Sequence, residues 1–410
     1  MSPSRRRWRA LEWTWAACVL VFLTGAARHW MVEPSLAGGA LTPGQIVVAA
    51  YLAVTAAVLA RVRRDALPVA ARSWPILLLP VLALASTLWS EAPAPTFRRA
   101  VSLAGTAGFG LLLAVRFTLA EQVRLVALAL AVTIGASAAA ALLFPEYGLM
   151  TGEHAGAWQG LFFHKNLLGR PAALAALAFL FLALGSDRWR PPALLGLAGS
   201  IAVVAASGSR TALLAGGAAG AVALVLALVH RLPPARRGRA LAVAGGAGLV
   251  LLAVLAWRAD EALALIGRDA TLTNRTRIWS AALDALAERP LLGYGYHAFW
   301  RSDAAARIGA RIGWEPQHAH NGFLDVGLEL GVAGAALFLA PFLYYLGRAL
   351  AAGRAAGALA GWWPFVYLSY YALANLAESP LVRQHTLGWA LYVATVGTLV
   401  RRPAPAAGRD

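Results

Sequence analysis

Two histidines stand two residues apart at the end of a long polar segment, directly before an apolar run. They are His318 and His320, and Asn321 follows them as a candidate helix N-cap. A neutral imidazole can accept a proton from a hydroxyl group, and the dipole at a helix N-terminus favours both this neutral form and a bound anion such as phosphate. The junction therefore predicts general-base chemistry on an anionic substrate. The alternative is a solvated loop histidine beside a packing face.

Glycines recur along the predicted helix below the second histidine. At 100° per residue, Gly327, Gly331 and Gly334 fall within about 40° of His320. The stripe predicts room for a neighbouring helix or for a bulky ligand.

Arginines stand at the ends of other predicted helices. Arg210 lies in a turn too short for a proper loop, 207–211, where an arginine at membrane depth indicates function; the alternative is a snorkelling side chain. Arg275 and Arg277 stand at the start of a predicted amphipathic helix, 276–288. One guanidinium group can bind two phosphate oxygens at once, so these two arginines could hold a lipid diphosphate. Contact with anionic headgroups is the alternative.

The amphipathic helix is expected to rest on the outer face of the protein. Asn274 or Thr276 could cap it, and Pro290 should stop it. Its apolar face comprises five residues: Ile278, Trp279, Ala282, Leu283 and Leu286.

Further polar residues stand near predicted spans. Lys165 and Asn166 directly precede one and are candidate substrate contacts. Three acids lie near or inside spans: Asp325, Glu329 and Glu378. We expect them to pair with Arg210 or Arg383 and hold helices together. No spacing fits a metal site, and no cofactor is predicted.

The composition identifies a polytopic membrane protein. The 410 residues are 60% hydrophobic and 13% charged, whereas soluble proteins have about 25% charged residues. Runs long enough to span a bilayer recur along the chain. We predict an all-α fold with about twelve spans: 11–27, 45–60, 74–89, 100–115, 125–144, 171–185, 193–206, 211–229, 240–256, 323–346, 362–376 and 386–400.

The basic residues predict the topology. The formal net charge is +17, and the arginines concentrate in alternate short loops, which places both termini inside. This pattern is a topology signal and indicates no nucleic-acid partner. The first range is expected to be an uncleaved helix. Three parts follow: spans one to nine in 1–256, an outer loop in 257–322, and the last three spans with an inside tail in 323–410.

One sequence pattern resembles a known family. His320 and Asn321, followed after nine residues by Gly331 and after two more by Gly334, match the motif of bacterial O-antigen ligases. The layout is also similar to that family and to the related O-antigen and exopolysaccharide polymerases, which share a long periplasmic loop before the third-last span.

Other segments carry the same resemblance. Ser207–Arg210 and Arg277–Trp279 match the family's arginine positions, and Phe163–Gly169 is more similar to the exopolysaccharide polymerase branch. The resemblance covers most of the chain from about residue 150. The N-terminal third matches only in hydropathy.

The resemblance implies metal-independent glycosyl transfer at the periplasmic face of the bacterial inner membrane. The donor would be a glycan on undecaprenyl diphosphate, and the acceptor a sugar hydroxyl of lipid A core or of another lipid-linked glycan. His320 would be the base, and Arg210 and Arg277 would hold the diphosphate, with Arg275 and His318 as helpers.

Two other classes of function remain open. A transporter or lipid flippase also suits twelve spans, although the internal repeats common in carriers are not visible here. A scaffold for a polysaccharide assembly complex would leave His320 merely structural.

Overall fold

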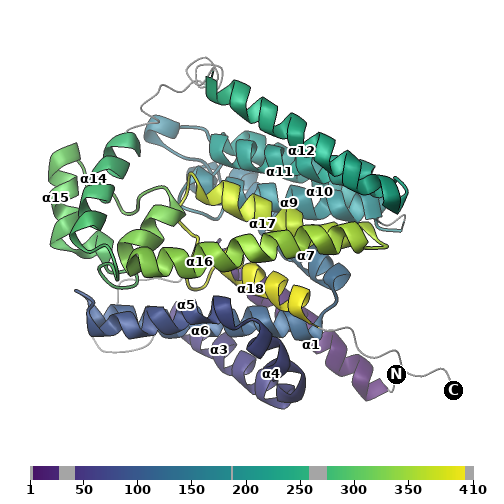
Figure 1. Ribbon diagram of the computed structural model, residues 1–410, viewed down its shortest axis with the longest axis horizontal. Helices are drawn as coiled ribbons and strands as arrows, with labels where there is room; N and C mark the ends of the chain where they lie inside the picture. The colour runs from purple at the N-terminus through teal and green to yellow at the C-terminus, as the bar shows by residue number, and fades with distance from the viewer. Residues whose placement is uncertain (1–2, 27–41, 186–187, 258–274, 402–410) are drawn as a thin grey trace.

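In the computed structural model the described residues form a bundle of helices without strands (Figure 1). The description covers residues 3–26, 42–185, 188–257 and 275–401. The α-helices are α1 Pro3–Leu23, α3 Pro43–Arg61, α4 Arg63–Arg72, α5 Trp74–Ala85, α6 Pro93–Arg116, α7 Leu119–Leu143, α8 Pro145–Gly148, α9 Lys165–Gly185, α10 Arg190–Ser207, α11 Arg210–His230, α12 Pro234–Trp257, α14 Arg275–Glu288, α15 Asp303–Ile312, α16 Gly322–Ala355, α17 Trp363–Asn375 and α18 Leu387–Val400. Four short 3₁₀ turns complete them: η1 Ser86–Leu88, η2 Gly152–His154, η3 Phe299–Arg301 and η4 Leu359–Trp362.

The all-α membrane fold is confirmed. Within the described ranges, seven helices are long and apolar enough to cross a membrane, and the pair α4 and α5, bent by 87°, is an eighth candidate. Each of the twelve predicted ranges falls on a helix, but α17 and α18 are short. The count of twelve spans therefore stays a prediction. The segment 61–73, expected as a loop, is mostly the helix α4.

Aromatic rings on α17 form part of the core. Trp363, Tyr367 and Tyr371 follow one another at a spacing of four residues, so their rings stack along one face with centroids 6.2 and 5.8 Å apart. Tyr392 of α18 continues the stack at 5.8 Å from Tyr371. This column fixes α17 against α18.

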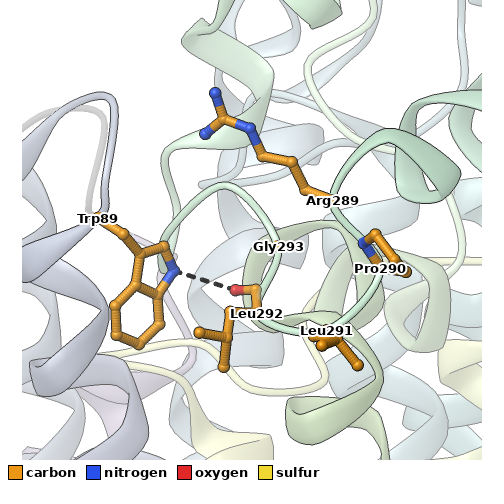
Figure 2. Close-up of a pocket in the computed structure, with 6 residues that line it drawn as sticks. All are labelled: Trp89, Arg289, Pro290, Leu291, Leu292 and Gly293. Atoms are coloured by element: carbon orange, nitrogen blue, oxygen red, sulfur yellow. Dashed lines mark hydrogen bonds between the residues drawn. The ribbon is translucent and has the colours of Figure 1, made fainter.

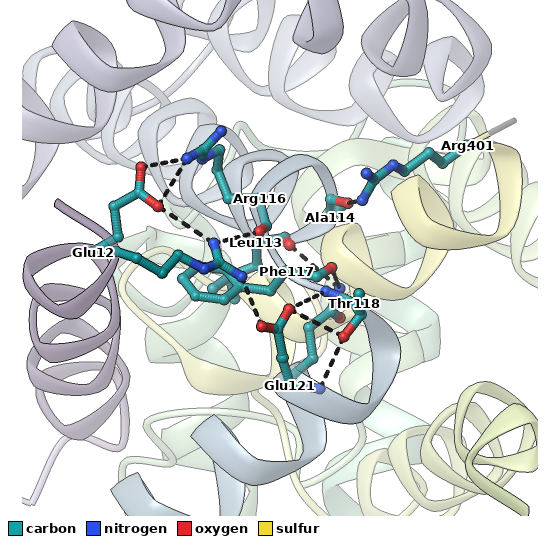
Figure 3. Close-up of polar contacts among 10 residues, drawn as sticks. Glu12, Leu113, Ala114, Arg116, Phe117, Thr118, Glu121 and Arg401 are labelled. Atoms are coloured by element: carbon teal, nitrogen blue, oxygen red, sulfur yellow. Dashed lines mark hydrogen bonds and ion pairs between the residues drawn. The ribbon is translucent and has the colours of Figure 1, made fainter. Parts of the chain in front are cut away.

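Charged residues tie several helices together at one end of the bundle (Figure 3). Arg9 near the start of α1 donates to the carbonyl of Arg116, which ends α6, and to Glu121 at the start of α7. Arg401, after α18, donates to the carbonyl of Ala114. The start of α1 and the end of α18 therefore lie on the same side, as the predicted topology requires.

The opposite end carries α14 and α15, on the left of Figure 1. There, Thr96 near the start of α6 donates to the carbonyl of Tyr296. We call this the site end, because the predicted functional residues lie there.

Candidate functional site

Four helices that carry predicted site residues begin at the site end: α9, α11, α14 and α16. The starts of α9 and α11 touch, because a Cβ atom on Gly169 would lie only 2.6 Å from the Cβ atom of Ser209. Asn166 in the first turn of α9 donates a 3.0 Å hydrogen bond to Glu378, which follows α17. Helix N-termini carry partial positive charge, so their convergence favours a bound anion.

The start of α16 has the predicted cap. The Asn321 side chain accepts from the backbone N–H groups of Phe323 and Leu324 at 3.1 and 3.2 Å. The rings of His318 and His320 meet edge to face, with centroids 4.1 Å apart. His320 itself has φ of +52°, a left-handed conformation that L-residues with side chains rarely adopt.

Charged groups from three other segments influence the pKa of His320. Burial lowers the pKa of His320; Glu378 opposes this shift, and the positive charge of Arg275 adds to it, followed by His164 and Arg170. Because the pKa lies below its ordinary value, His320 is neutral near pH 7 and can accept a proton.

The second histidine is affected more strongly. Burial, then the neighbouring His320 and the charge of Arg383, lower the pKa of His318 to about 3. The Nδ1 atoms of both rings are buried and have no hydrogen-bond partner among the described residues. Both imidazoles are therefore neutral at the site end.

The helix α14 lies against the histidine loop. Arg275 is buried, Arg277 is exposed, and the indole N–H of Trp279 donates a 2.8 Å hydrogen bond to the carbonyl of Ala319. The helix ends at Glu288, two residues before Pro290 as predicted. Asn274, a proposed cap, lies outside the described residues.

One detail of the predicted apolar face of α14 was wrong. Leu283 is 56% exposed, whereas Ala281 and Ala285, which we had not assigned to that face, are buried. The face is rotated towards the small residues because α14 packs closely on α15 and α16. Small side chains permit that approach, and Leu283 points away from it.

The remaining predicted residues lie around this centre. Arg210 is the first residue of α11 and is exposed; Ser209 caps that helix by accepting from the N–H of Ala212. Lys165 is the first residue of α9 and half-buried, next to Asn166. Contacts between helix starts thus bring Lys165, Asn166 and Arg210 to the same end as the histidines.

Sequence reasoning missed the proximity of Arg170, His164 and Glu378 to His320. Glu378 was expected only to hold helices together, yet its charge acts on His320. Arg170 lies one residue beyond the contact between α9 and α11. No local spacing connects these residues with His320, because tertiary packing alone brings them there.

The prediction that acids pair with Arg383 is confirmed for two of the three acids, Asp325 and Glu329. Arg383 contacts Glu329 at 2.6 Å and Asp325 at 3.8 Å, and both carboxylates are buried. An arginine that is only 14% exposed, between two acids, holds the segment before α18 against α16. Removing one partner of such a cluster is costly because a buried charge is left without compensation.

The glycine stripe on α16 faces two different neighbours: a Cβ atom on Gly327 would meet Leu286 of the helix α14 at 3.5 Å, whereas Gly331 receives a loop. At Gly331 the helix is broken, with φ +66° and ψ −168°. The N–H groups of Tyr294 and Gly295 bind the carbonyls of Leu328 and Glu329 at 3.0 and 2.9 Å.

The same loop binds the far side of the break. The carbonyls of Pro290 and Leu291 accept from Val332 and Ala333 at 2.8 and 3.2 Å. The loop 290–295 therefore satisfies backbone groups that the break exposes. A Cβ atom on Gly331 would lie 2.2 Å from the Leu291 carbonyl oxygen, so only glycine permits the contact.

A concavity of about 350 Å³ lies beside this loop (Figure 2). Its lining is Trp89 together with Arg289, Pro290, Leu291, Leu292 and Gly293. The Trp89 indole donates to the Leu292 carbonyl at 3.1 Å, which fixes the rim. None of the predicted site residues lines it. Within the described ranges, no group of three or more His, Cys, Asp or Glu residues could hold a metal ion.

The fold and this site define a polytopic α-helical membrane protein with a histidine and arginine centre at the mouth of a capped helix. Comparison with known proteins gives the family. Residues 193–339 match the family model described as O-antigen ligase. The chain is 30% identical over 311 residues to the exopolysaccharide production protein ExoQ of Rhizobium meliloti (strain 1021), covering 64% of this chain and 69% of that protein.

A second relative matches over a shorter range. A putative polysaccharide ligase of Rickettsia prowazekii (strain Madrid E) is 36% identical over 78 residues, which is 18% of this chain and 19% of that protein. The chain therefore belongs to the family of O-antigen ligases and related polysaccharide polymerases. The family is one of membrane enzymes that process polysaccharides, and the matched range includes Arg210, Arg277 and His320.

Proposed function

We propose that the protein is a glycosyltransferase at the periplasmic face of the bacterial inner membrane. It moves a glycan from undecaprenyl diphosphate to a sugar hydroxyl group. In the ligase reaction this hydroxyl group belongs to lipid A core. The observation that carries this proposal is the half-buried, neutral His320 at the capped start of α16, beside Arg275 and Arg170. A neutral base next to cations suits a hydroxyl nucleophile and a diphosphate leaving group.

The proposed reaction is a single displacement at the anomeric carbon of the donor glycan. His320 takes the proton of the acceptor hydroxyl while its oxygen bonds to the anomeric carbon of the donor glycan. The bond from that carbon to the diphosphate oxygen breaks, and undecaprenyl diphosphate leaves with the electron pair. Arg210, Arg277 and Arg275 stabilise the charge that develops on the diphosphate, as a metal ion does in other transferases.

A polymerase reaction is the second candidate, in which the acceptor is another lipid-linked glycan. Two observations favour it. The segment with His164, Lys165 and Asn166 lies at the histidine centre, and the longer relative match is to an exopolysaccharide production protein. The acceptor distinguishes the two reactions, since the donor and the base are shared.

The test uses purified protein with undecaprenyl diphosphate-linked glycan and a chelator in every tube, because the mechanism uses no metal. Lipid A core is present in one tube and absent in the other. Glycan on lipid A core, lost in His320→Ala and Arg210→Ala, supports the ligase. Lengthening of the lipid-linked glycan without lipid A core supports the polymerase. No transfer in either tube by folded protein contradicts the proposal and favours a transporter.

A further inference from the structure

The peptide groups of Ala319, between the two histidines, are held by side chains from two helices. Ala319 is fully buried. Its N–H donates to Asp325 Oδ1 at 3.1 Å, and its carbonyl accepts from the Trp279 indole at 2.8 Å. Neither group is bound by regular secondary structure, so these two side chains fix the path of the loop.

The carboxylate that holds Ala319 is itself fixed. Asp325 is 2% exposed, and the Trp300 indole donates to the same Oδ1 atom at 2.7 Å. Arg383 lies 3.8 Å from the other oxygen. A buried carboxylate with two N–H donors and a cation has little freedom to turn.

The loop needs such support because of its backbone. His320 follows directly at φ +52°, a conformation that is unfavourable outside glycine and persists only where neighbours impose it. Asn321 fixes the residue after it by capping α16. Hydrogen bonds on both sides of His320 therefore determine where its imidazole points.

We propose that Trp279 and Asp325 are positioning residues for His320. Trp279 belongs to α14, which also carries Arg275 and Arg277. The single hydrogen bond from Trp279 to Ala319 fixes the position of His320 relative to the arginines of α14. The same helix therefore aligns the base with the diphosphate of the donor. This inference rests on the proposed function, and it predicts a defect in the chemical step rather than in donor binding.

The first test is Trp279→Phe, which keeps an aromatic ring and removes the N–H donor. We expect kcat to fall about tenfold, the effect of leaving a buried carbonyl without its partner, while KM for the lipid-linked donor stays within about twofold. Trp314→Phe is the matched control, since Trp314 is an exposed tryptophan in the same segment, 275–321. It should match the wild type in both constants.

The second readout does not depend on activity. Diethyl pyrocarbonate modifies neutral imidazoles, and mass spectrometry separates His320 from the other histidines. Modification of His320 should accelerate in Trp279→Phe and not in Trp314→Phe, with His154 as the internal reference. An unchanged modification rate together with an unchanged kcat overturns the inference. Faster modification in a protein that transfers no glycan retains the positioning role and refutes the proposed function instead.

The carboxylate is tested by a pair of variants. Asp325→Asn keeps an oxygen that accepts from Ala319 and Trp300, whereas Asp325→Ala removes it. Both lose the charge beside Arg383, so that loss is common to the two. We expect His320 in Asp325→Asn to be modified at nearly the wild-type rate and in Asp325→Ala several times faster. Equal rates in the two variants would contradict the role of the oxygen.

Discussion

Replacing Gly331 with alanine should detach the loop 290–295 from α16. The native φ of +66° with ψ of −168° is open essentially only to glycine, and imposing it on alanine costs about 1–3 kcal/mol. The new Cβ atom would lie 2.2 Å from the Leu291 carbonyl oxygen, so the loop must move. Each backbone hydrogen bond lost there contributes about 0.5–1.5 kcal/mol. We expect a total loss near 3 kcal/mol in local stability.

Hydrogen exchange measures that loss residue by residue. A decrease of about 3 kcal/mol in the free energy of local opening raises the exchange rates of the Tyr294 and Val332 amides about a hundredfold. Gly347→Ala is the control on the same helix, because a Cβ atom at Gly347 meets nothing within 4 Å. That change should be neutral or stabilising by up to about 1 kcal/mol. Wild-type protection of Tyr294 and Val332 in Gly331→Ala would refute the account of the break.

Three further predictions concern charge. Arg275→Gln removes a positive charge that lowers the pKa of His320, so the acidic limb of the pH profile of kcat should move to higher pH. The pKa of His318 is about 3 in the folded chain against an ordinary 6.5, so the unfolded chain binds the extra proton between these values. Stability should therefore fall as pH drops from about 6.5 towards 3, and His318→Gln should flatten that decline in thermal unfolding. Arg383→Met leaves Glu329 buried without its cation and should destabilise the fold by about 3–5 kcal/mol, measured by chemical unfolding beside the wild type.

The predictable parts of this molecule were those governed by local rules. Asn321 caps α16 because a short polar side chain before an apolar run can reach the next free N–H groups. The end of α14 before Pro290 follows from the missing N–H of proline. The pairing of Arg383 with Asp325 and Glu329 follows because charges inside a membrane need partners.

The unpredicted parts depend on contacts between distant segments. Gly331 has the spacing of a helix-packing glycine, and that spacing says nothing of the loop that interrupts the helix there. The influence of Glu378 and Arg170 on His320 arises from the meeting of α9, α17 and α16. Leu283 shows the same limit at smaller scale, since helical periodicity gives an apolar face but the neighbouring helices decide its centre.

The bridged break in α16 has a consequence for how the protein is made. Residues 290–295 leave the ribosome before α16, and on the predicted topology they cross the membrane first. The carbonyls of Leu328 and Glu329 then enter the bilayer region with no partner in their own helix, where each unsatisfied group costs several kcal/mol. Insertion of α16 is therefore complete only once the earlier segment has returned to it. The histidine loop lies between these two pieces of chain, so we expect it to take its final shape only in this last step of membrane assembly.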